Sequence, residues 1–164
     1  MTNLASPDYY CVMGNPVAHS RSPWIHARFA ALTGQVLRYD RRLIALDGFA
    51  QGLRDFLAEG GRGCNITVPF KFAAAEVAQH FSPRAQLAQA ANTLTVRDDG
   101  IYADNTDGAG LVADIERNAG VRLAGRDVLL IGAGGAAAGV LGPLLAAGPA
   151  RLTVVRSEER RVGK

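Results

Sequence analysis

The sequence has few cysteines, few aromatic residues and no long apolar run. Of its 164 residues, two are cysteines and 7% are aromatic. Cys11 and Cys64 each lie in an apolar stretch outside any CxxC pair, so we interpret them as reduced core thiols. No apolar run reaches the ~20 residues that a membrane span needs, and the N-terminus does not resemble a signal peptide. These absences predict a soluble, cytoplasmic protein with no membrane partner.

A strong charge of one sign is also missing. The formal net charge is +3, but the last nine residues carry four basic and two acidic side chains, which leaves 14 basic and 13 acidic ones before them. No basic stripe is interleaved with aromatic residues, so we predict no nucleic-acid partner. The three histidines lack metal-ligand spacing, and we predict no metal site. We interpret His19 as a structural loop residue, and His26 and His80 as surface or half-buried residues of helices.

Segments that suit strands alternate with segments that suit helices. Ser22 is expected to cap the first helix and Gly34 to end it. The alternation predicts an α/β fold with a mostly parallel sheet, and we place a domain boundary at Asp107. Residues 1–106 would form one α/β domain, and residues 107–164 the first βαβ part of a Rossmann domain. Strands are expected at 9–13, 36–44, 63–70, 128–131 and 151–155, a hairpin at 92–105, and helices at 22–34, 47–61, 70–81, 82–90 and 106–120.

A glycine-rich turn follows the strand at 128–131. Residues 132–137 read GAGGAA, fit the pattern G-x-G-x-x-A and open an alanine-rich helix, which is the context of a dinucleotide site. The alternative is a tight strand-to-helix turn with only a structural role. Arg156 follows the next strand, where a basic residue suits the extra phosphate of NADP. The candidate cofactor-binding residues are Gly132, Ala133, Gly134, Gly135, Ala136 and Arg156.

Polar side chains gather where the expected strands end. Ligands of open α/β sheets bind beyond the carboxyl ends of the strands, so these side chains are candidates for one site. Hydroxyls, amides, one lysine and one carboxylate suit a small polyhydroxylated acid. The residues in question are Asn15, His19, Ser20, Ser22, Thr67, Lys71, Asn92, Asn105, Thr106 and Asp107.

Lys71 is the only lysine before the last residue, and every other basic side chain up to there is arginine. Arginine stays protonated, whereas a lysine can lose its proton in a suitable site and so can act as a general acid or base. Asp107 could hold such a lysine. The alternative is a surface lysine in the first turn of a helix.

Five motifs together resemble one family. In order, they are "GNPVAHSRSPWIH", "NITVPFK", "AANTL", "DNTDGAG" and "LLIGAGGAAAGV". From about residue 10 to residue 155 the chain closely resembles the shikimate dehydrogenases. That resemblance implies a substrate domain, an NADP-binding Rossmann domain after it, and an active site in the cleft between them.

The resemblance also implies a role for each matching residue. Ser20 and Ser22 match the serines that bind the shikimate carboxylate, and Thr67 matches a further substrate contact. Asn92 matches the asparagine that contacts the ring hydroxyls. Asp107 matches an aspartate that orients the catalytic lysine and hydrogen-bonds a ring hydroxyl.

The implied reaction is reversible hydride transfer between NADPH and the carbonyl of 3-dehydroshikimate. Lys71 matches the catalytic lysine, which donates a proton to the developing alkoxide or removes it in reverse. The cofactor loop corresponds to residues 132–136, and NADP is the implied cofactor.

The C-terminus departs from the family pattern. Members are longer, and their C-terminal helices bring a glutamine and a tyrosine to the substrate, so we expect this chain to be an N-terminal fragment with little dehydrogenase activity. Residues 156–164 match the translation of a common sequencing adapter, and Val155 stands where the family has asparagine. We therefore expect this tail to be non-native, which would make the fit of Arg156 to an NADP site accidental.

Two alternatives stay open at this point. One is a quinate/shikimate dehydrogenase that uses NAD. The serine pair favours shikimate over quinate as the substrate. The other is a non-catalytic module that binds a small polyol acid or a nucleotide, which a Lys71→Met variant would distinguish because a module has no turnover to lose. The sequence is compatible with a homodimer and does not determine the assembly.

Overall fold

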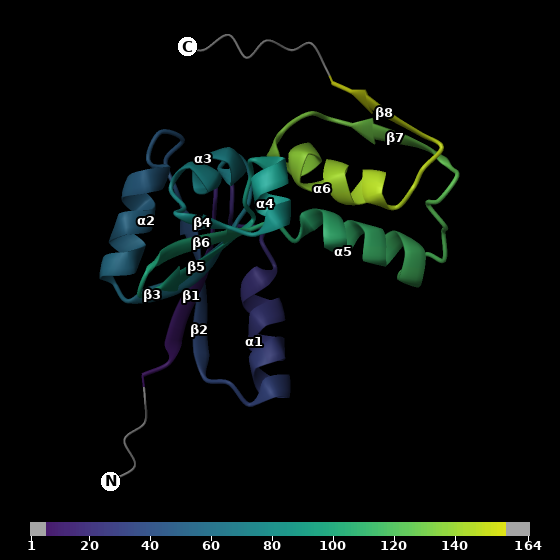
Figure 1. Ribbon diagram of the computed structural model, residues 1–164. Helices are drawn as coiled ribbons and strands as arrows, with labels where there is room; N and C mark the ends of the chain where they lie inside the picture. The colour runs from purple at the N-terminus through teal and green to yellow at the C-terminus, as the bar shows by residue number, and fades with distance from the viewer. Residues whose placement is uncertain (1–5, 157–164) are drawn as a thin grey trace.

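The computed structural model describes residues 6–156, which form an α/β fold with two sheets (Figure 1). Residues 8–104 supply a six-stranded sheet with the order β2-β1-β3-β5-β6-β4, and β7 and β8 form a second sheet. The elements are β1 (Asp8–Gly14), α1 (Ser22–Thr33), β2 (Leu37–Leu43), α2 (Phe49–Ala58), β3 (Gly61–Ile66), α3 (Lys71–Glu76), β4 (His80–Phe81), α4 (Pro83–Ala88), β5 (Thr93–Arg97), β6 (Gly100–Asp104), α5 (Asp107–Ala113), a π-helical turn η1 (Asp114–Asn118), β7 (Asp127–Ile131), α6 (Gly135–Ala146) and β8 (Arg151–Val155).

The strand order of the large sheet reverses at β1. Strand β1 pairs in parallel with both β2 and β3, while β5 runs antiparallel to its neighbours β3 and β6. Right-handed crossovers to opposite sides of β1 place α1 and α2 on opposite faces of the sheet. The loop after β1 leads to α1 on one face, and the loop after β3 leads to α3, which contacts α2 on the other face. The region at the carboxyl ends of these two strands is where such sheets bind ligands.

The main core lies between this sheet and α2. Helix α2 has an apolar stripe with Phe49, Leu53 and Phe56 buried, as its 3.6-residue periodicity predicts. Cys11 and Cys64 face each other in the β1–β3 register, and both are buried free thiols. This agrees with the interpretation of both as reduced core residues.

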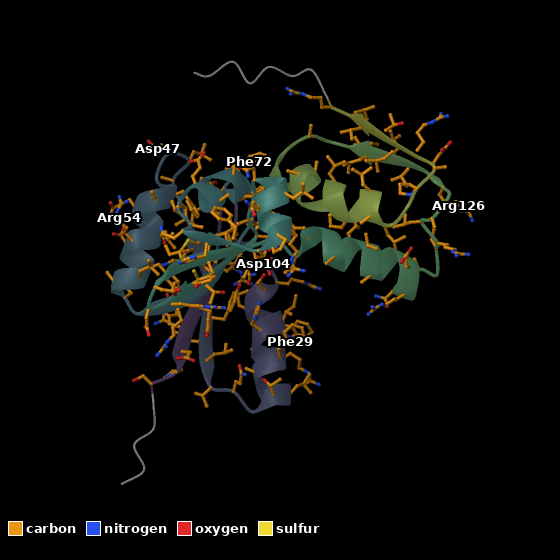
Figure 2. The ribbon with its side chains drawn as sticks, viewed as in Figure 1. Phe29, Asp47, Arg54, Phe72, Asp104 and Arg126 are labelled. Atoms are coloured by element: carbon orange, nitrogen blue, oxygen red, sulfur yellow. The ribbon has the colours of Figure 1, made fainter. Side chains whose placement is uncertain are left out.

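Some large apolar side chains of the helices remain outside the core. Phe29 on α1 and Phe72 on α3, both labelled in Figure 2, are exposed, as is Trp24 at the start of α1. Helix α1 buries only Ala30 fully, so its contact with the sheet is slight. Among residues 6–156, no helix is long and apolar enough to cross a bilayer.

The second sheet belongs to a β7–α6–β8 unit with parallel strands, as expected of the start of a Rossmann domain. Helix α6 packs against α5 and α4, and Figure 1 shows α6 between the β7–β8 sheet and α5, with α4 near its start. A methyl group on Gly139 of α6 would lie 2.6 Å from Nδ2 of the buried Asn105. The glycine therefore allows α6 to approach the loop that carries Asp107.

Three local predictions were wrong. The strand expected at 63–70 ends at Ile66, and residues 68–70 form a turn. Ser22 is the first helical residue rather than the cap: Arg21 occupies the cap position, and the hydroxyl of Ser20 accepts a hydrogen bond from Ser22 N at 3.3 Å. The helix expected at 70–81 ends at Glu76, and His80 lies in β4. Strand β4 forms because His80 pairs with Tyr102 of β6, and that long-range pairing overrides the local helical pattern.

Candidate active site

A cleft of about 350 Å³ lies at the carboxyl ends of β1 and β3. It is lined by the loop after β1, the loop after β3, the residue before β5 and the first residue of α5. The structure thus brings together all six residues that the sequence predicts for substrate binding and proton transfer. They are Ser20, Ser22, Thr67, Lys71, Asn92 and Asp107.

Lys71 and Asp107 form an ion pair in this cleft. Lys71 begins α3 and Asp107 begins α5, and the Lys71 ammonium donates a hydrogen bond to Oδ2 of Asp107. The lysine side chain is 11% exposed and the aspartate 23%. The pair is therefore shielded from solvent on most sides yet open to the cleft, an arrangement suited to exchanging a proton with a bound ligand.

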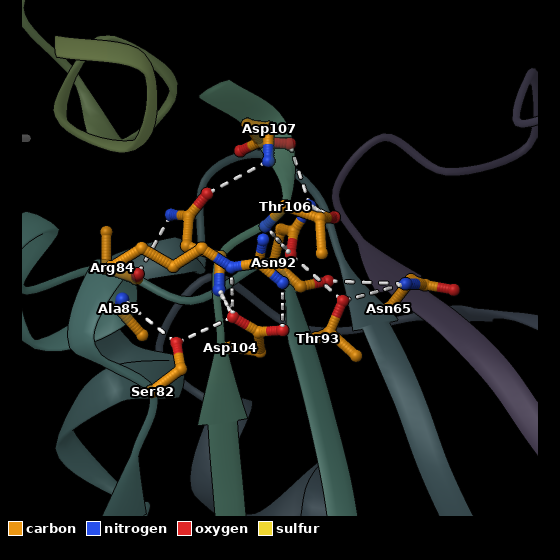
Figure 3. Close-up of polar contacts among 11 residues, drawn as sticks. Asn65, Ser82, Arg84, Ala85, Asn92, Thr93, Asp104, Thr106 and Asp107 are labelled. Carbon is orange, nitrogen blue, oxygen red and sulfur yellow. Dashed lines mark hydrogen bonds and ion pairs between the residues drawn. The ribbon is translucent and has the colours of Figure 1, made fainter. Parts of the chain in front are cut away.

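Asn92 holds the other oxygen of the aspartate. Its Nδ2 donates to Oδ1 of Asp107 at 2.9 Å and to Oγ1 of Thr106 at 2.8 Å (Figure 3). The backbone N–H of Asp107 donates to Oδ1 of the buried Asn105 at 3.2 Å. Both carboxylate oxygens thus have a donor, so the aspartate has a fixed orientation toward Lys71.

Two serines line the cleft from the loop after β1 and the start of α1. The hydroxyl of Ser20 lies 3.1 Å from that of Ser22, and Arg41 donates from Nε to the carbonyl oxygen of Ser20 at 2.7 Å. The serine loop is therefore tied to β2. Paired hydroxyl donors on a tethered loop suit an anionic group such as a carboxylate. His19 also lines the cleft, and it is exposed.

Sequence reasoning missed Asn65, Tyr39 and His26. Asn65 lines the cleft from β3, and its Oδ1 accepts a 2.6 Å hydrogen bond from the Tyr39 hydroxyl. The His26 ring stacks on that of Tyr39, with ring centroids 4.1 Å apart. Burial lowers the pKa of His26 and raises the pKa of Tyr39, so both are neutral at pH 7. A polar residue inside the apolar run GCNI was the available signal for Asn65.

The glycine loop lies next to this cleft. A Cβ on Gly135 would be 2.9 Å from Cβ of Lys71, so the start of α6 touches the lysine. Gly132 has a φ of 118°, which favours glycine. Gly134 has an ordinary φ of −92°, and no described atom lies within 4 Å of its absent Cβ. Protein packing therefore does not require glycine at 134, whereas a phosphate close to the backbone would, and the loop fits a dinucleotide.

The remaining candidates give less information. Arg156 directly follows β8 and is exposed, while residues 157–164 of the expected non-native tail lie outside the described residues. In residues 6–156, no group of three or more His, Cys, Asp or Glu side chains is arranged to hold a metal ion.

Asp104, at the end of β6, anchors the segment that leads to Asp107. Its carboxylate accepts hydrogen bonds from Nε and Nη2 of Arg84 at 2.7 and 2.6 Å, and from Ser82 Oγ at 2.6 Å (Figure 3). The hydrogen-bonded Arg84 guanidinium, aided by Ser82, lowers the pKa of Asp104 from 3.8 to about 2. The carboxylate is thus charged in the folded protein throughout the neutral and mildly acidic range.

This shift predicts a pH-dependent contribution to stability. Because the folded pKa is lowered, the contribution is complete above pH 4 and is lost as the pH falls toward 2. An Arg84→Met variant should lose at most about 1 kcal/mol of unfolding free energy at pH 6, since the pair is partly exposed. Urea denaturation at pH 6 and pH 2.5 measures the difference, which should be clearly smaller at pH 2.5, where the carboxylate is already protonated in the unfolded chain and begins to be protonated in the folded protein. A difference independent of pH would contradict this assignment.

Comparison with known proteins identifies the family to which this architecture belongs. Residues 12–94 match the family described as "Shikimate dehydrogenase substrate binding domain". The chain belongs to the shikimate dehydrogenase family, as the motifs predicted.

Individual relatives agree in sequence and fold. The chain is 69% identical to a shikimate dehydrogenase (NADP(+)) of Acidovorax sp. (strain JS42) over 157 residues, which are 96% of this chain and 56% of the relative. It is 48% identical to an Ael1 enzyme from Pseudomonas putida, with a TM-score of 0.82 over 92% of this chain and 56% of that structure. It is 32% identical to shikimate 5-dehydrogenase of Thermus thermophilus, which was solved with NADP(H) and shikimate. The TM-score is 0.82 over 92% of this chain and 56% of that structure. The chain thus spans about half the length of the curated relatives it matches.

Proposed function

We propose that this chain provides the shikimate site of an NADP-dependent shikimate dehydrogenase, which reversibly reduces 3-dehydroshikimate to shikimate. The observation that carries the proposal is the convergence of two serines, a threonine, an asparagine and a Lys–Asp pair on one 350 Å³ cleft. The names of the relatives support the choice of substrate.

The two sides of the cleft suit the two ends of shikimate. The hydroxyls of Ser20 and Ser22 would donate hydrogen bonds to its carboxylate. Across the cleft, Asp107 would accept a hydrogen bond from a ring hydroxyl, and Thr67 would contact the ring from the loop after β3. This arrangement orients the reacting C–O group toward Lys71.

In this proposal Lys71 handles the proton. During reduction its ammonium would donate a proton to the oxygen of the developing alkoxide, and during oxidation the neutral amine would remove it. Asp107 would keep the amine aimed at that oxygen and would balance its charge. A positioned acid–base of this kind typically contributes ~10²–10⁴-fold to the rate.

The proposed cofactor is NADP, held by residues 132–136 at the start of α6, and its nicotinamide would supply the hydride when bound. The names of the relatives and the contact between Gly135 and Lys71 support this proposal.

We also propose the division of the chain into two domains, residues 1–106 and 107–164, which is supported by the separate sheets. A cytoplasmic location is in keeping with the two free thiols, and a homodimer stays a prediction from the sequence.

Shikimate binding tests the proposal on the chain itself, because the six residues all lie within it. We expect a dissociation constant on the order of 1 mM, as for a ligand of this size. Replacing Ser20 and Ser22 together with alanine should weaken binding at least about tenfold, because two hydrogen bonds to a charged group are lost. Titration followed by NMR measures both constants.

The methyl ester of shikimate is the matched control, since it keeps the ring and loses the anionic group. The ester should bind the wild-type chain and the double variant with similar weak affinity. If the wild-type chain does not bind shikimate, the proposed substrate is wrong. If the variant binds shikimate as tightly as the wild type, the carboxylate lies elsewhere.

A further inference from the structure

The side chain of Asn92 is fully engaged by the protein. Its Oδ1 accepts from Thr93 Oγ1 at 2.9 Å and from Thr106 N at 3.0 Å, while its Nδ2 donates to Thr106 Oγ1 and to Asp107 Oδ1. A primary amide has two N–H donors and two acceptor lone pairs, so all four are used. The amide is therefore fixed with its nitrogen, not its oxygen, toward the carboxylate.

A directional chain of hydrogen bonds leads to this amide from β2. The Tyr39 hydroxyl donates to Asn65 Oδ1 at 2.6 Å, and Asn65 Nδ2 donates to Thr93 Oγ1 at 3.2 Å. Thr93 Oγ1 in turn donates to Asn92, as Figure 3 shows. Every link donates in the same sense, toward the carboxylate of Asp107. Because burial raises the pKa of Tyr39, its O–H donor persists at neutral pH.

The chain ends on the oxygen of Asp107 that Lys71 does not use. Lys71 donates to Oδ2 and Asn92 to Oδ1, so rotation of the carboxylate would break one bond or the other. If the Asn92 amide were reversed, its oxygen would face the carboxylate. Two acceptors would then meet with no proton between them, which is unfavourable. The orientation of the Lys71–Asp107 pair therefore depends on what holds Asn92.

We propose that Thr93 is a positioning residue for the Lys71–Asp107 pair, acting through Asn92. Its hydroxyl accepts from Asn65 and donates to Asn92, so it joins the polar chain from β2 to the amide that orients the aspartate. The amide links cannot pass a proton readily, so the chain orients groups rather than transferring protons. The catalytic importance of this orientation rests on the proposed function, but the orientation itself does not.

The lysine content of the chain gives a direct measurement. Lys71 and Lys164 are the two lysines of the sequence, so trace acylation with acetic anhydride, followed by mass spectrometry, reports their relative reactivity within one sample. A nitrogen that is held by the carboxylate of Asp107 and is largely buried is poorly accessible to the anhydride, so loosening the pair should expose it to the reagent. Thr93→Val should therefore raise the Lys71/Lys164 ratio about 3- to 10-fold, the factor expected for one hydrogen bond. Asp107→Asn sets the upper limit of the effect.

Two variants separate positioning from packing. Thr93→Ser restores the hydroxyl and should return the ratio to within about twofold of the wild type. Thr95 lies two residues along β5. Like Thr93 it lines a second cavity, which shares Asn65 and His26 with the cleft, and the structure gives its side chain no hydrogen bond among the described residues. Thr95→Val is thus the matched control and should leave the ratio unchanged.

Several outcomes would overturn the proposal. One is a Lys71/Lys164 ratio that is unchanged in Thr93→Val. The others are a rise in Thr93→Ser, or in Thr95→Val, that equals the rise in Thr93→Val. Thermal unfolding shows whether each variant is folded. Should Thr93→Val not fold, Tyr39→Phe removes the first donor of the chain without loss of volume, and a ratio unchanged from the wild type would then count against the proposal. Failure of shikimate binding would contradict the proposed function and leave this result standing.

Discussion

Replacing Lys71 with methionine is expected to reduce turnover about 10²–10⁴-fold and to leave the affinity for shikimate within about threefold. Methionine keeps an unbranched stem of similar length and removes the ammonium that would exchange the proton. The serines and Thr67 remain in place, so most of the binding contacts are retained.

Turnover is best measured in a chain of the relatives' length. Residues 1–155 of this protein can be joined to the C-terminal remainder of the Acidovorax enzyme, with which the shared part is 69% identical. Shikimate oxidation is followed by the absorbance of reduced nicotinamide, with NADP and with NAD in separate assays. The Acidovorax enzyme carrying the equivalent substitution is the control for the junction.

The result distinguishes the alternatives left open by the sequence. Turnover that falls in Lys71→Met supports the proposed dehydrogenase, while higher turnover with quinate than with shikimate would favour the quinate/shikimate alternative. A chimera that binds shikimate and has no turnover indicates a binding module. Wild-type turnover in Lys71→Met would show that another group, or water, handles the proton.

The composition of the site could be predicted from sequence because of a general property of parallel sheets. The carboxyl ends of β1 and β3 meet at one edge, so the polar residues after each strand were expected to lie together. Ser20, Ser22, Thr67 and Lys71 follow this rule, and the structure brings them into one cleft. Asn92 and Asp107, at the two ends of the hairpin, were already in this set, and the family resemblance gave them specific roles.

The polar chain behind the site could not be predicted. Tyr39 and Asn65 meet although β1 lies between their strands, and no local pattern specifies which residues of β2 and β3 lie opposite one another. Strand β4 was missed for the same reason. The segment FAAAEVAQHF has helix-forming residues, and only pairing with β6 gives His80 and Phe81 their extended conformation.

A second large effect is expected at Phe56, at the opposite end of the sheet from the cleft. Phe56 is 0% exposed. Its ring meets the edge of Tyr9 with centroids 4.9 Å apart, and it lies so close to β3 that a Cβ on Gly61 would be 2.3 Å from it. Phe56→Ala should lower the unfolding free energy by about 3–5 kcal/mol, because a large cavity replaces a fully packed ring. Urea denaturation at pH 7 measures the change.

Phe72→Ala is the matched control, because Phe72 is 43% exposed (Figure 2), and it should cost under about 1 kcal/mol. Equal losses in the two variants would contradict the core assignment. If Phe56→Ala does not fold, Phe56→Leu keeps more of the volume and should cost about 1.5 kcal/mol or less. Because Phe56 lies at the amino ends of β1 and β3, the molecules that stay folded should bind shikimate with wild-type affinity. If shikimate binding weakens only in proportion to the unfolded fraction, Phe56 contributes to the stability of the sheet and not to the cleft at its other end.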